Sequence, residues 1–227
     1  MRTPREWVDH LEAHLPLALS GADPEGVHQV RVAGRRLRAY LDLLGWRVLR
    51  DDLRRLVRGA GRVRDLEVAL GHPLPPGFRA HLEEEVRRAR EALPPLLASP
   101  WTAALLRALR VLPPLGEEAW GRLRRLERRA EARLKALQAE PSLEALHAYR
   151  RALRRVRYAK EFLGLSAKRE KALQEVLGGL QDLEVLLGLL EGYLAQAPDP
   201  EGEALRAELL VRRQEALAGV LEALREA

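Results

Sequence analysis

Two stretches decide the fold: VHQVRVAGRRLR at residues 27–38 and LHAYRRALRRVR at residues 146–157. They align without a gap, and one His and four Arg coincide. The segments that follow also end alike, with GRVRDLEV at residues 61–68 and GGLQDLEV at residues 178–185. The distance along the chain between the two copies, which begin at residues 27 and 146, far exceeds the roughly 20 to 50 residues of a solenoid unit. We therefore predict an internal duplication, with repeat 1 at about 1–112, repeat 2 at about 113–227 and a boundary near Pro113-Pro114.

The rest of the chain predicts an all-α fold. It contains 47 Leu and no Ile or Asn, and apolar residues recur at three- and four-residue spacing between breaks at Pro and Gly. Ser142, just after Pro141, has the signature of a helix N-cap. The expected helices span residues 5–19, 24–45, 50–70, 77–98, 101–111, 117–139, 142–164, 167–195 and 200–225.

Each repeated stretch carries basic residues on one helical face and apolar residues on the other. At 100° per residue, Arg31, Arg35 and Arg38 lie within about 80° of His28. The opposite side holds apolar residues that we expect in the core: Val30, Leu37, Leu41 and Leu44, and in the second copy Tyr149, Val156 and Leu163.

Positive charge is concentrated on these faces. The chain has 35 Arg, 4 Lys and a formal net charge of +6, but residues 28–64 carry +8, residues 147–160 carry +6, and the remainder sums to −8. Residues 83–91 and 117–135 mix their Arg with acids at i, i+4 spacing, as a self-compensating solvated face does. Residues 28–41 and 147–160 contain no acid at all, which favours a polyanion-binding surface over a solvated face.

The pattern His-x-x-Arg-x-x-x-Arg-Arg-Leu/Val-Arg, present twice, each time followed by a segment containing Gly-x-x-x-Asp-Leu, resembles the CHAD domain, the conserved histidine α-helical domain. The resemblance covers essentially the whole chain, which would be a single, stand-alone CHAD domain over residues 1–227. It implies two four-helix bundles related by a pseudo-twofold around a basic cavity or channel. It further implies binding of inorganic polyphosphate and targeting to polyphosphate granules.

Carried over by position, the polyphosphate ligands form two sets with the same pattern: His28, Arg31, Arg35, Arg36 and Arg38, and His147, Arg150, Arg154, Arg155 and Arg157. Further basic residues on the next helix of each repeat, or near its start, are less certain ligands: Arg55, Arg58, Arg62, Lys160, Lys168 and Lys171. Gly179 and Gln181 replace Arg62 and Arg64 in the second copy, which leaves room for an asymmetric site.

Other functions have weaker support in the sequence. A metal site at His28 or His147 would need carboxylate or thiolate partners on the same face, and the chain has no Cys. No catalytic triad, phosphate-binding loop or acidic metal cluster is evident, so we expect no enzymatic activity and no cofactor. Phosphohydrolase activity on polyphosphate is the less favoured enzymatic alternative.

Nucleic acid is the main alternative ligand, because a basic groove also binds its phosphates. Single-strand readers add exposed aromatic platforms, whereas aromatics here make up 4% of residues. We expect most of them to serve helix packing: Trp7, Tyr40, Trp101, Trp120, Tyr149 and Phe162. The lack of Cys, of a signal-like apolar run in Met1 to Glu12 and of a membrane-length apolar segment predicts a cytoplasmic protein with no membrane partner.

Overall fold

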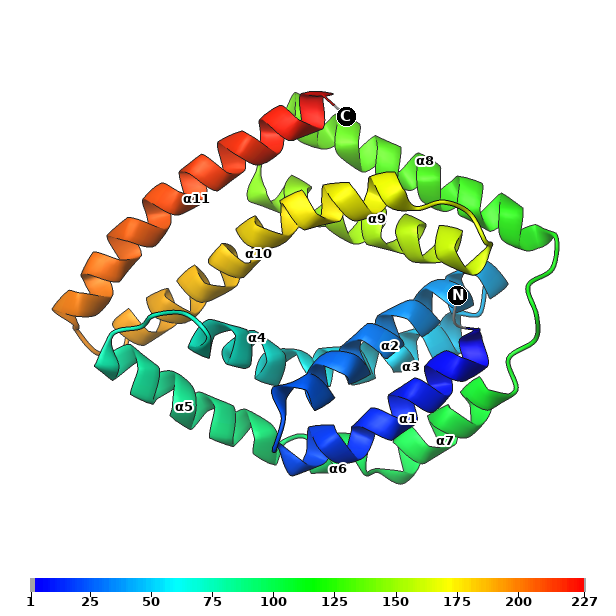
Figure 1. Ribbon diagram of the computed structural model, residues 1–227, viewed down its shortest axis with the longest axis horizontal. Helices are drawn as coiled ribbons and strands as arrows, with labels where there is room; N and C mark the ends of the chain where they lie inside the picture. Colours follow the sequence, from blue (N-terminus) through cyan, green and yellow to red (C-terminus); the bar gives the residue numbers. More distant parts are fainter. Residues whose placement is uncertain (1–2, 227) are drawn as a thin grey trace. The chain divides into compact units, whose positions relative to one another are not determined.

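The computed structural model describes residues 3–226, with side chains through residue 224. These residues form helices and no strand, which confirms the all-α prediction. The helices are shown in Figure 1: α1 Pro4–Ser20, α2 Pro24–Leu44, α3 Arg47–Gly59, α4 Gly61–Leu70, α5 Pro76–Glu91, α6 Pro94–Leu97, α7 Pro100–Arg110, α8 Glu118–Ala139, α9 Leu143–Phe162, α10 Lys168–Leu194 and α11 Pro200–Glu226.

Two expected helices are each divided in the structure. The helix expected over residues 50–70 begins at Arg47 and is interrupted at Ala60, which lies between two glycines, residues of low helix propensity. The helix expected over residues 77–98 ends at Glu91, because Pro94 has no N–H to donate and the residue before a proline is disfavoured in the helical region. The expected N-cap is confirmed, since Ser142 Oγ accepts a hydrogen bond from Ala145 N at 3.2 Å.

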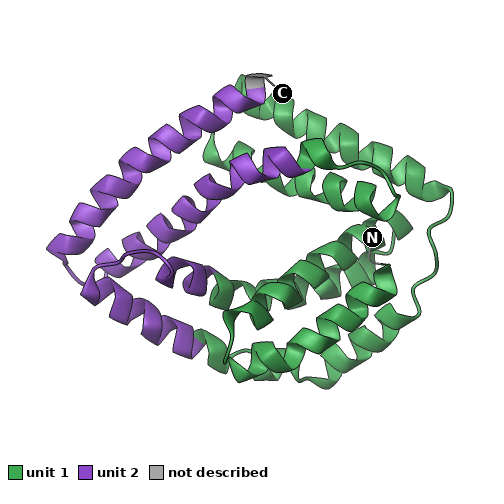
Figure 2. Cartoon of the chain, viewed as in Figure 1, with its two compact units in different colours: residues 1–64, 89–170 green, residues 65–88, 171–227 purple. Residues whose placement is uncertain are grey.

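The chain forms two compact units, coloured separately in Figure 2. Unit 1 contains residues 1–64 and 89–170, and unit 2 contains residues 65–88 and 171–227. Each unit therefore takes segments from both halves of the sequence. The divisions fall inside α4, α5 and α10. The predicted duplication into repeats 1–112 and 113–227, with its pseudo-twofold, remains a prediction from the sequence.

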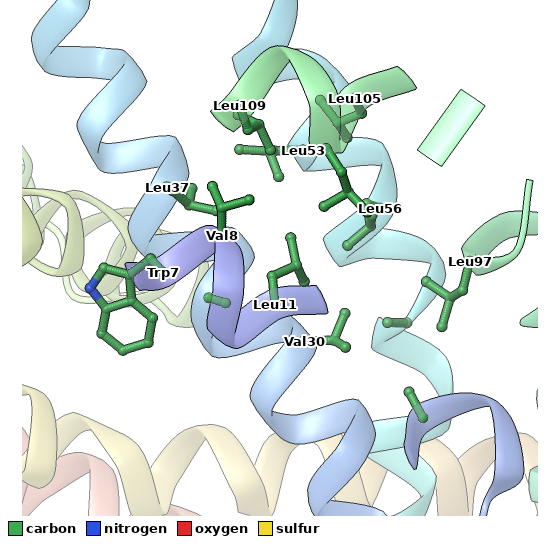
Figure 3. Close-up of a cluster of buried hydrophobic side chains, with 14 of the residues drawn as sticks. Trp7, Val8, Leu11, Val30, Leu37, Leu53, Leu56, Leu97, Leu105 and Leu109 are labelled. Carbon is green, nitrogen blue, oxygen red and sulfur yellow. The ribbon is translucent and has the colours of Figure 1, made fainter. Parts of the chain in front are cut away.

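Helix α2 is the central element of unit 1, with contacts to α1, α3, α8 and α9. Its predicted core residues Val30, Leu37 and Leu41 are fully buried, and Leu44 is partly buried. Figure 3 shows the larger core, in which side chains of α2 meet those of α1, α3, α6 and α7. Burying each such Leu stabilises the fold by about 1.5–3 kcal/mol. This packing fixes the direction in which the basic residues of α2 point.

A second core lies where α8 and α9 meet the end of α2. It consists of small and aliphatic side chains, including Leu43, Leu123 and Val156. The predicted core residue Tyr149 is also buried, and Leu163 is partly buried at the C-cap of α9. The two basic helices, α2 and α9, are thus held side by side within one unit.

Unit 2 is built from the remaining parts of α4, α5 and α10 together with α11. Its buried side chains include Leu66, Phe78 and Leu177, and the rings of Phe78 and Tyr193 lie 5.4 Å apart. The Tyr193 hydroxyl donates to Asp199 Oδ2 at 3.0 Å, which ties the end of α10 to the turn before α11. This unit contains only one of the predicted ligand residues, Lys171.

Candidate functional site

Helices α2, α3 and α9 of unit 1 enclose a pocket of about 500 Å³, which we call the main basic pocket. Its lining residues come from all three helices: Arg35, Arg38, Ala39, Asp42, Arg54, Val57, Arg58, Arg151, Arg154, Arg155 and Tyr158. Gly34 permits this arrangement, because a Cβ at that position would lie 2.5 Å from Val57 Cγ2 on α3. Five of the predicted ligands, Arg35, Arg38, Arg58, Arg154 and Arg155, therefore meet in one cavity although they come from both sequence repeats.

Seven arginines line this pocket against a single carboxylate, that of Asp42. The charge of two of them is strongly disfavoured. Burial lowers the pKa of Arg154 to about 9, and repulsion by Arg35, Arg150 and Arg31 adds to the effect. Burial, followed by repulsion from Arg155, lowers the pKa of Arg38 to about 10. Both remain protonated at neutral pH, so the free protein holds several cations together at a cost in stability.

Asp42 neutralises little of the positive charge of these seven arginines. Asp42 Oδ1 lies 3.2 Å from Nη1 of Arg50, a residue that does not line the main basic pocket. Asp42 Oδ2 lies 4.0 Å from Nε of Arg155, which does line it. The Nε of Arg38 is buried and has no hydrogen-bond acceptor among the residues that the structure describes. A buried donor of this kind favours an added acceptor. An anion in the pocket would supply that acceptor and relieve the repulsion.

Two predicted ligands, Arg36 and Arg157, have a different environment. Their guanidinium groups share the carboxylate of Glu161, with Arg157 Nε 2.9 Å from Oε1 and Arg36 paired with Oε2. The guanidinium of Arg36 also lies 4.6 Å from the ring centroids of Trp7 and Tyr158. We call this set, Trp7, Arg36, Arg157, Tyr158 and Glu161, the Glu161 cluster. It ties α2 to α9 and α1 and pairs both cations with one carboxylate, although Arg36 Nε, like Arg38 Nε, is buried without a hydrogen-bond acceptor among the residues that the structure describes.

His28 and Arg31 lie toward the start of α2, beyond the residues that line the main basic pocket. Arg31 Nη1 donates to the carbonyl of Gly61 at 2.7 Å, which joins α2 to the start of α4. Burial lowers the pKa of His28, and the charge of Arg64 is the next cause. Arg35 and Arg31 lower it further, whereas Glu25 raises it. His28 is therefore neutral at pH 7.

The remaining predicted ligands also lie outside the lining of the main basic pocket. His147 and Arg150 are half-buried in the first half of α9. Arg150 is nonetheless near enough to lower the pKa of Arg154. Lys160 Nζ is 2.7 Å from Glu170 and 3.4 Å from Glu127, so acids within unit 1 already neutralise it.

Most of the less certain ligands, which were predicted on the helix after each repeated stretch, do not line the main basic pocket. Arg58 lines the pocket, but the guanidinium of Arg55 lies 4.7 Å above the Trp101 ring, on a different side of α3. Arg62 and Lys168 are exposed and do not line it. Lys171 belongs to unit 2, where its Nζ lies 3.8 Å from Glu175.

Arg54 and Arg151 line the pocket although neither was among the predicted ligands. A periodic signal for both is present in the sequence. Arg54 precedes Arg58 by four residues, and Arg151 precedes Arg155 by four, so each pair shares one helical face. The predicted set followed the pattern of the first repeat, where Val32 stands in place of Arg151, and therefore omitted Arg151. Arg54 was omitted because the prediction for residues 50–70 took the i, i+3, i+7 series of Arg55, Arg58 and Arg62.

Two other features bear on the range of chemistry. Among the side chains that the structure describes, those of residues 3–224, no group of three or more His, Cys, Asp or Glu is placed to hold a metal ion. In the same part of the chain, no helix has both the length and the apolar character that crossing a membrane requires. Of the aromatic residues expected in helix packing, Trp7, Tyr40 and Tyr149 are buried and Trp101 and Phe162 are partly buried, whereas Trp120 is 43% exposed; Trp46, beside the start of α3, is 42% exposed.

Comparison with known proteins places this arrangement in a family. The family model of the CHAD domain matches residues 5–170. The crystal structure of the CHAD domain from the plant Ricinus communis aligns with a TM-score of 0.76 and 25% identity, over 96% of this chain and 88% of that one. PptA from Streptomyces chartreusis has the same fold, with a TM-score of 0.71 and 18% identity over 98% and 95% of the two chains.

No curated protein sequence matches the chain significantly. The family model nevertheless covers well over half of the residues, including both basic helices, α2 and α9. Together with the structural similarity to a solved CHAD domain, this shows that the chain belongs to the CHAD domain family.

Proposed function

We propose that this protein binds inorganic polyphosphate non-covalently in the main basic pocket. The observation that carries the proposal is the set of seven arginines around one cavity, two of them with a lowered pKa and only one carboxylate among them. Guanidinium groups form paired hydrogen bonds with phosphate oxygens. A chain of phosphates supplies closely spaced negative charges, which matches several arginines better than a single anion does.

The chemistry of the lining supports binding over catalysis. A general base must accept a proton near neutral pH. The arginines are protonated there, even Arg154 with its pKa of about 9, and the carboxylate of Asp42 is engaged by Arg50 and Arg155. We therefore propose a non-enzymatic role. The family resemblance implies a location at polyphosphate granules, and the lack of Cys favours the cytoplasm.

Nucleic acid remains the alternative ligand, and the pocket offers one feature that disfavours it. Tyr158 is the only aromatic residue in the lining, and its ring is buried under the guanidinium groups of Arg36 and Arg157, at 4.6 Å and 5.6 Å. Its faces are therefore not available to stack on a base. A ligand with phosphates and no bases fits this lining better.

The direct test is a filter-binding or gel-shift titration of long-chain polyphosphate, single-stranded DNA and duplex DNA at physiological salt. We expect polyphosphate to bind most tightly, with an affinity that falls as salt rises. The double variant Arg38→Glu/Arg154→Glu should lose at least about 100-fold in affinity, since it places two anions in the pocket. Phosphate release from polyphosphate, measured with Mg²⁺, tests the enzymatic alternative.

A matched control is available on α8. Arg124 and Arg128 are exposed and do not line the main basic pocket. The variant Arg124→Glu/Arg128→Glu makes the same change in net charge and should keep polyphosphate affinity within about threefold. Tighter binding of DNA than of polyphosphate, or equal losses in the two double variants, would contradict the proposal.

A further inference from the structure

A second basic pocket lies in unit 1, at the junction of α2, α3 and α8, and is not part of the predicted site. It has a volume of about 310 Å³, and we call it the α8 pocket. Five arginines and one acid among its lining residues carry charge: Asp42, Arg47, Arg50, Arg122, Arg125 and Arg129. The three on α8 follow i, i+3, i+7 spacing and so lie along one helical face.

The local backbone brings these arginines together. Gly45 ends α2 with a φ of 74°, a conformation that other residues rarely adopt, and this turn brings Arg47 and Arg50 at the start of α3 beside α8. Arg122 Nη1 donates to the carbonyl of Leu43 at 2.9 Å, which fixes α8 against the end of α2. Packing and this backbone hydrogen bond fix the walls of the pocket, on which Arg50 and Arg122 are partly buried and Arg47, Arg125 and Arg129 are exposed.

The charge of the α8 pocket is poorly compensated. Residues 117–135 were expected to form a self-compensating surface, and Lys135 does pair with Glu131 at 2.8 Å. Glu127, however, points its carboxylate to Lys160 on α9, at 3.4 Å. Arg50 is paired with Asp42 and Asp51 at 3.2 Å each. Among the side chains of residues 3–224, none forms an ion pair with Arg47, Arg125 or Arg129.

Asp42 lines both this pocket and the main basic pocket. Each oxygen of this carboxylate lies near an arginine of a different pocket: Oδ1 near Arg50 of the α8 pocket and Oδ2 near Arg155 of the main basic pocket. The two cavities are therefore neighbours that meet at this carboxylate. A flexible polyanion leaving one pocket at Asp42 meets the arginines of the other.

We propose that the α8 pocket is a second phosphate-binding subsite, so that one long polyphosphate chain occupies both pockets and passes Asp42. This rests on the proposed function of the main basic pocket. A second subsite on the same chain raises affinity through effective concentration, without any new kind of contact. A short chain that fills only one pocket gains nothing from the other, so the subsite makes binding depend on chain length.

The test compares two double variants of the same helix with long-chain polyphosphate and with tripolyphosphate. Arg125→Glu/Arg129→Glu changes the α8 pocket, whereas Arg124→Glu/Arg128→Glu changes exposed residues outside its lining. We expect the first variant to lose at least about tenfold in affinity for the long chain and the second less than about threefold. The advantage of the long chain over tripolyphosphate should shrink in the first variant only.

Equal losses in the two variants, or an unchanged advantage of the long chain, would overturn the subsite while leaving the main basic pocket intact. If the wild-type protein binds no polyphosphate, the proposed function itself fails, so the two failures are distinguishable. Asp42→Asn adds an independent readout. Removing the carboxylate between the pockets should tighten long-chain binding by about threefold, and weaker binding in a variant with a wild-type melting curve would show that the chain does not pass Asp42.

Discussion

The Glu161 cluster and the main basic pocket contain arginines from the same two helices, but the surroundings of these arginines are opposite. Arg36 and Arg157 share the carboxylate of Glu161, and Arg36 lies against two aromatic rings. Arg38 and Arg154 are also half-buried, yet their neighbours are other arginines and their pKa values are lowered. Within one basic motif, then, some arginines hold helices together and others are left for an anion.

The difference follows from which partners each helical face meets. Glu161 lies one turn after Arg157, so the carboxylate reaches Arg157 along α9 and Arg36 across to α2. Two residues after Arg36, the charge of Arg38 is instead opposed by burial and by repulsion from Arg155 and Arg54, which the carboxylate of Asp42 offsets only in part. Structural arginines stabilise the free protein, whereas binding arginines should destabilise it until the ligand arrives. This distinction can be tested one residue at a time.

The largest expected effect is that of Arg154→Ala, which should separate binding from stability. We expect polyphosphate affinity to fall by about tenfold or more, as the loss of a charge-assisted contact predicts. The free energy of unfolding at pH 7 should rise by about 1–3 kcal/mol, because a repelled and partly buried cation is removed. Polyphosphate titration and urea denaturation measure the two quantities. A loss of stability together with unchanged affinity would place Arg154 among the structural residues.

The next largest effect is expected for Arg36→Ala, which should lower stability and leave polyphosphate affinity nearly unchanged, the reverse of Arg154→Ala. Arg36→Ala removes an ion pair with Glu161 and contacts with the rings of Trp7 and Tyr158. We expect the free energy of unfolding to fall by about 2 kcal/mol. Polyphosphate affinity of the folded protein should change by less than about threefold. Arg36→Lys is the matched control: it keeps the charge but loses the planar stacking, so it should fall between the wild type and Arg36→Ala in stability.

An affinity loss for Arg36→Ala as large as that for Arg154→Ala would contradict the division into two classes. Both titrations should be made well below the denaturation midpoint of the variant, so that the folded fraction is the same.

The fold could be predicted from the sequence where local chemistry decides it. The apolar face of α2, with Val30 and Leu37, and the N-cap at Ser142 depend on residues within a few turns of one another. The breaks at Ala60 and Pro94 were not predicted, since the expected helices over residues 50–70 and 77–98 ran through both positions. Which side of α2 is basic was therefore predictable, whereas the division of α3 from α4 was not.

The sequence predicted the site only where the charges along a single helix decide it, and not where ion pairs between helices do. The acid-free interval 147–160 ends one residue before Glu161, the carboxylate that neutralises Arg157 and Arg36. Only the packing of α9 against α2 shows that Glu161 reaches across to Arg36. The arginines of α8 were interpreted as part of a self-compensating face because Glu127 is close to them in the sequence. In the structure, however, Glu127 pairs with Lys160 on α9. Long-range pairing of charges decides which arginines remain for a ligand.

The smallest expected effect concerns pH and His28, on the same helix as both classes of arginine. Because its pKa in the folded protein is lowered by burial and by Arg64, the unfolded chain binds its proton more readily. The stability contribution of His28 is therefore lost as pH falls below about 6.5. A bound polyanion favours the protonated imidazole, so affinity for polyphosphate should rise by about twofold between pH 7.5 and pH 5.5. In His28→Gln this rise should be smaller, and an identical rise in the variant would show that the anion does not sense His28.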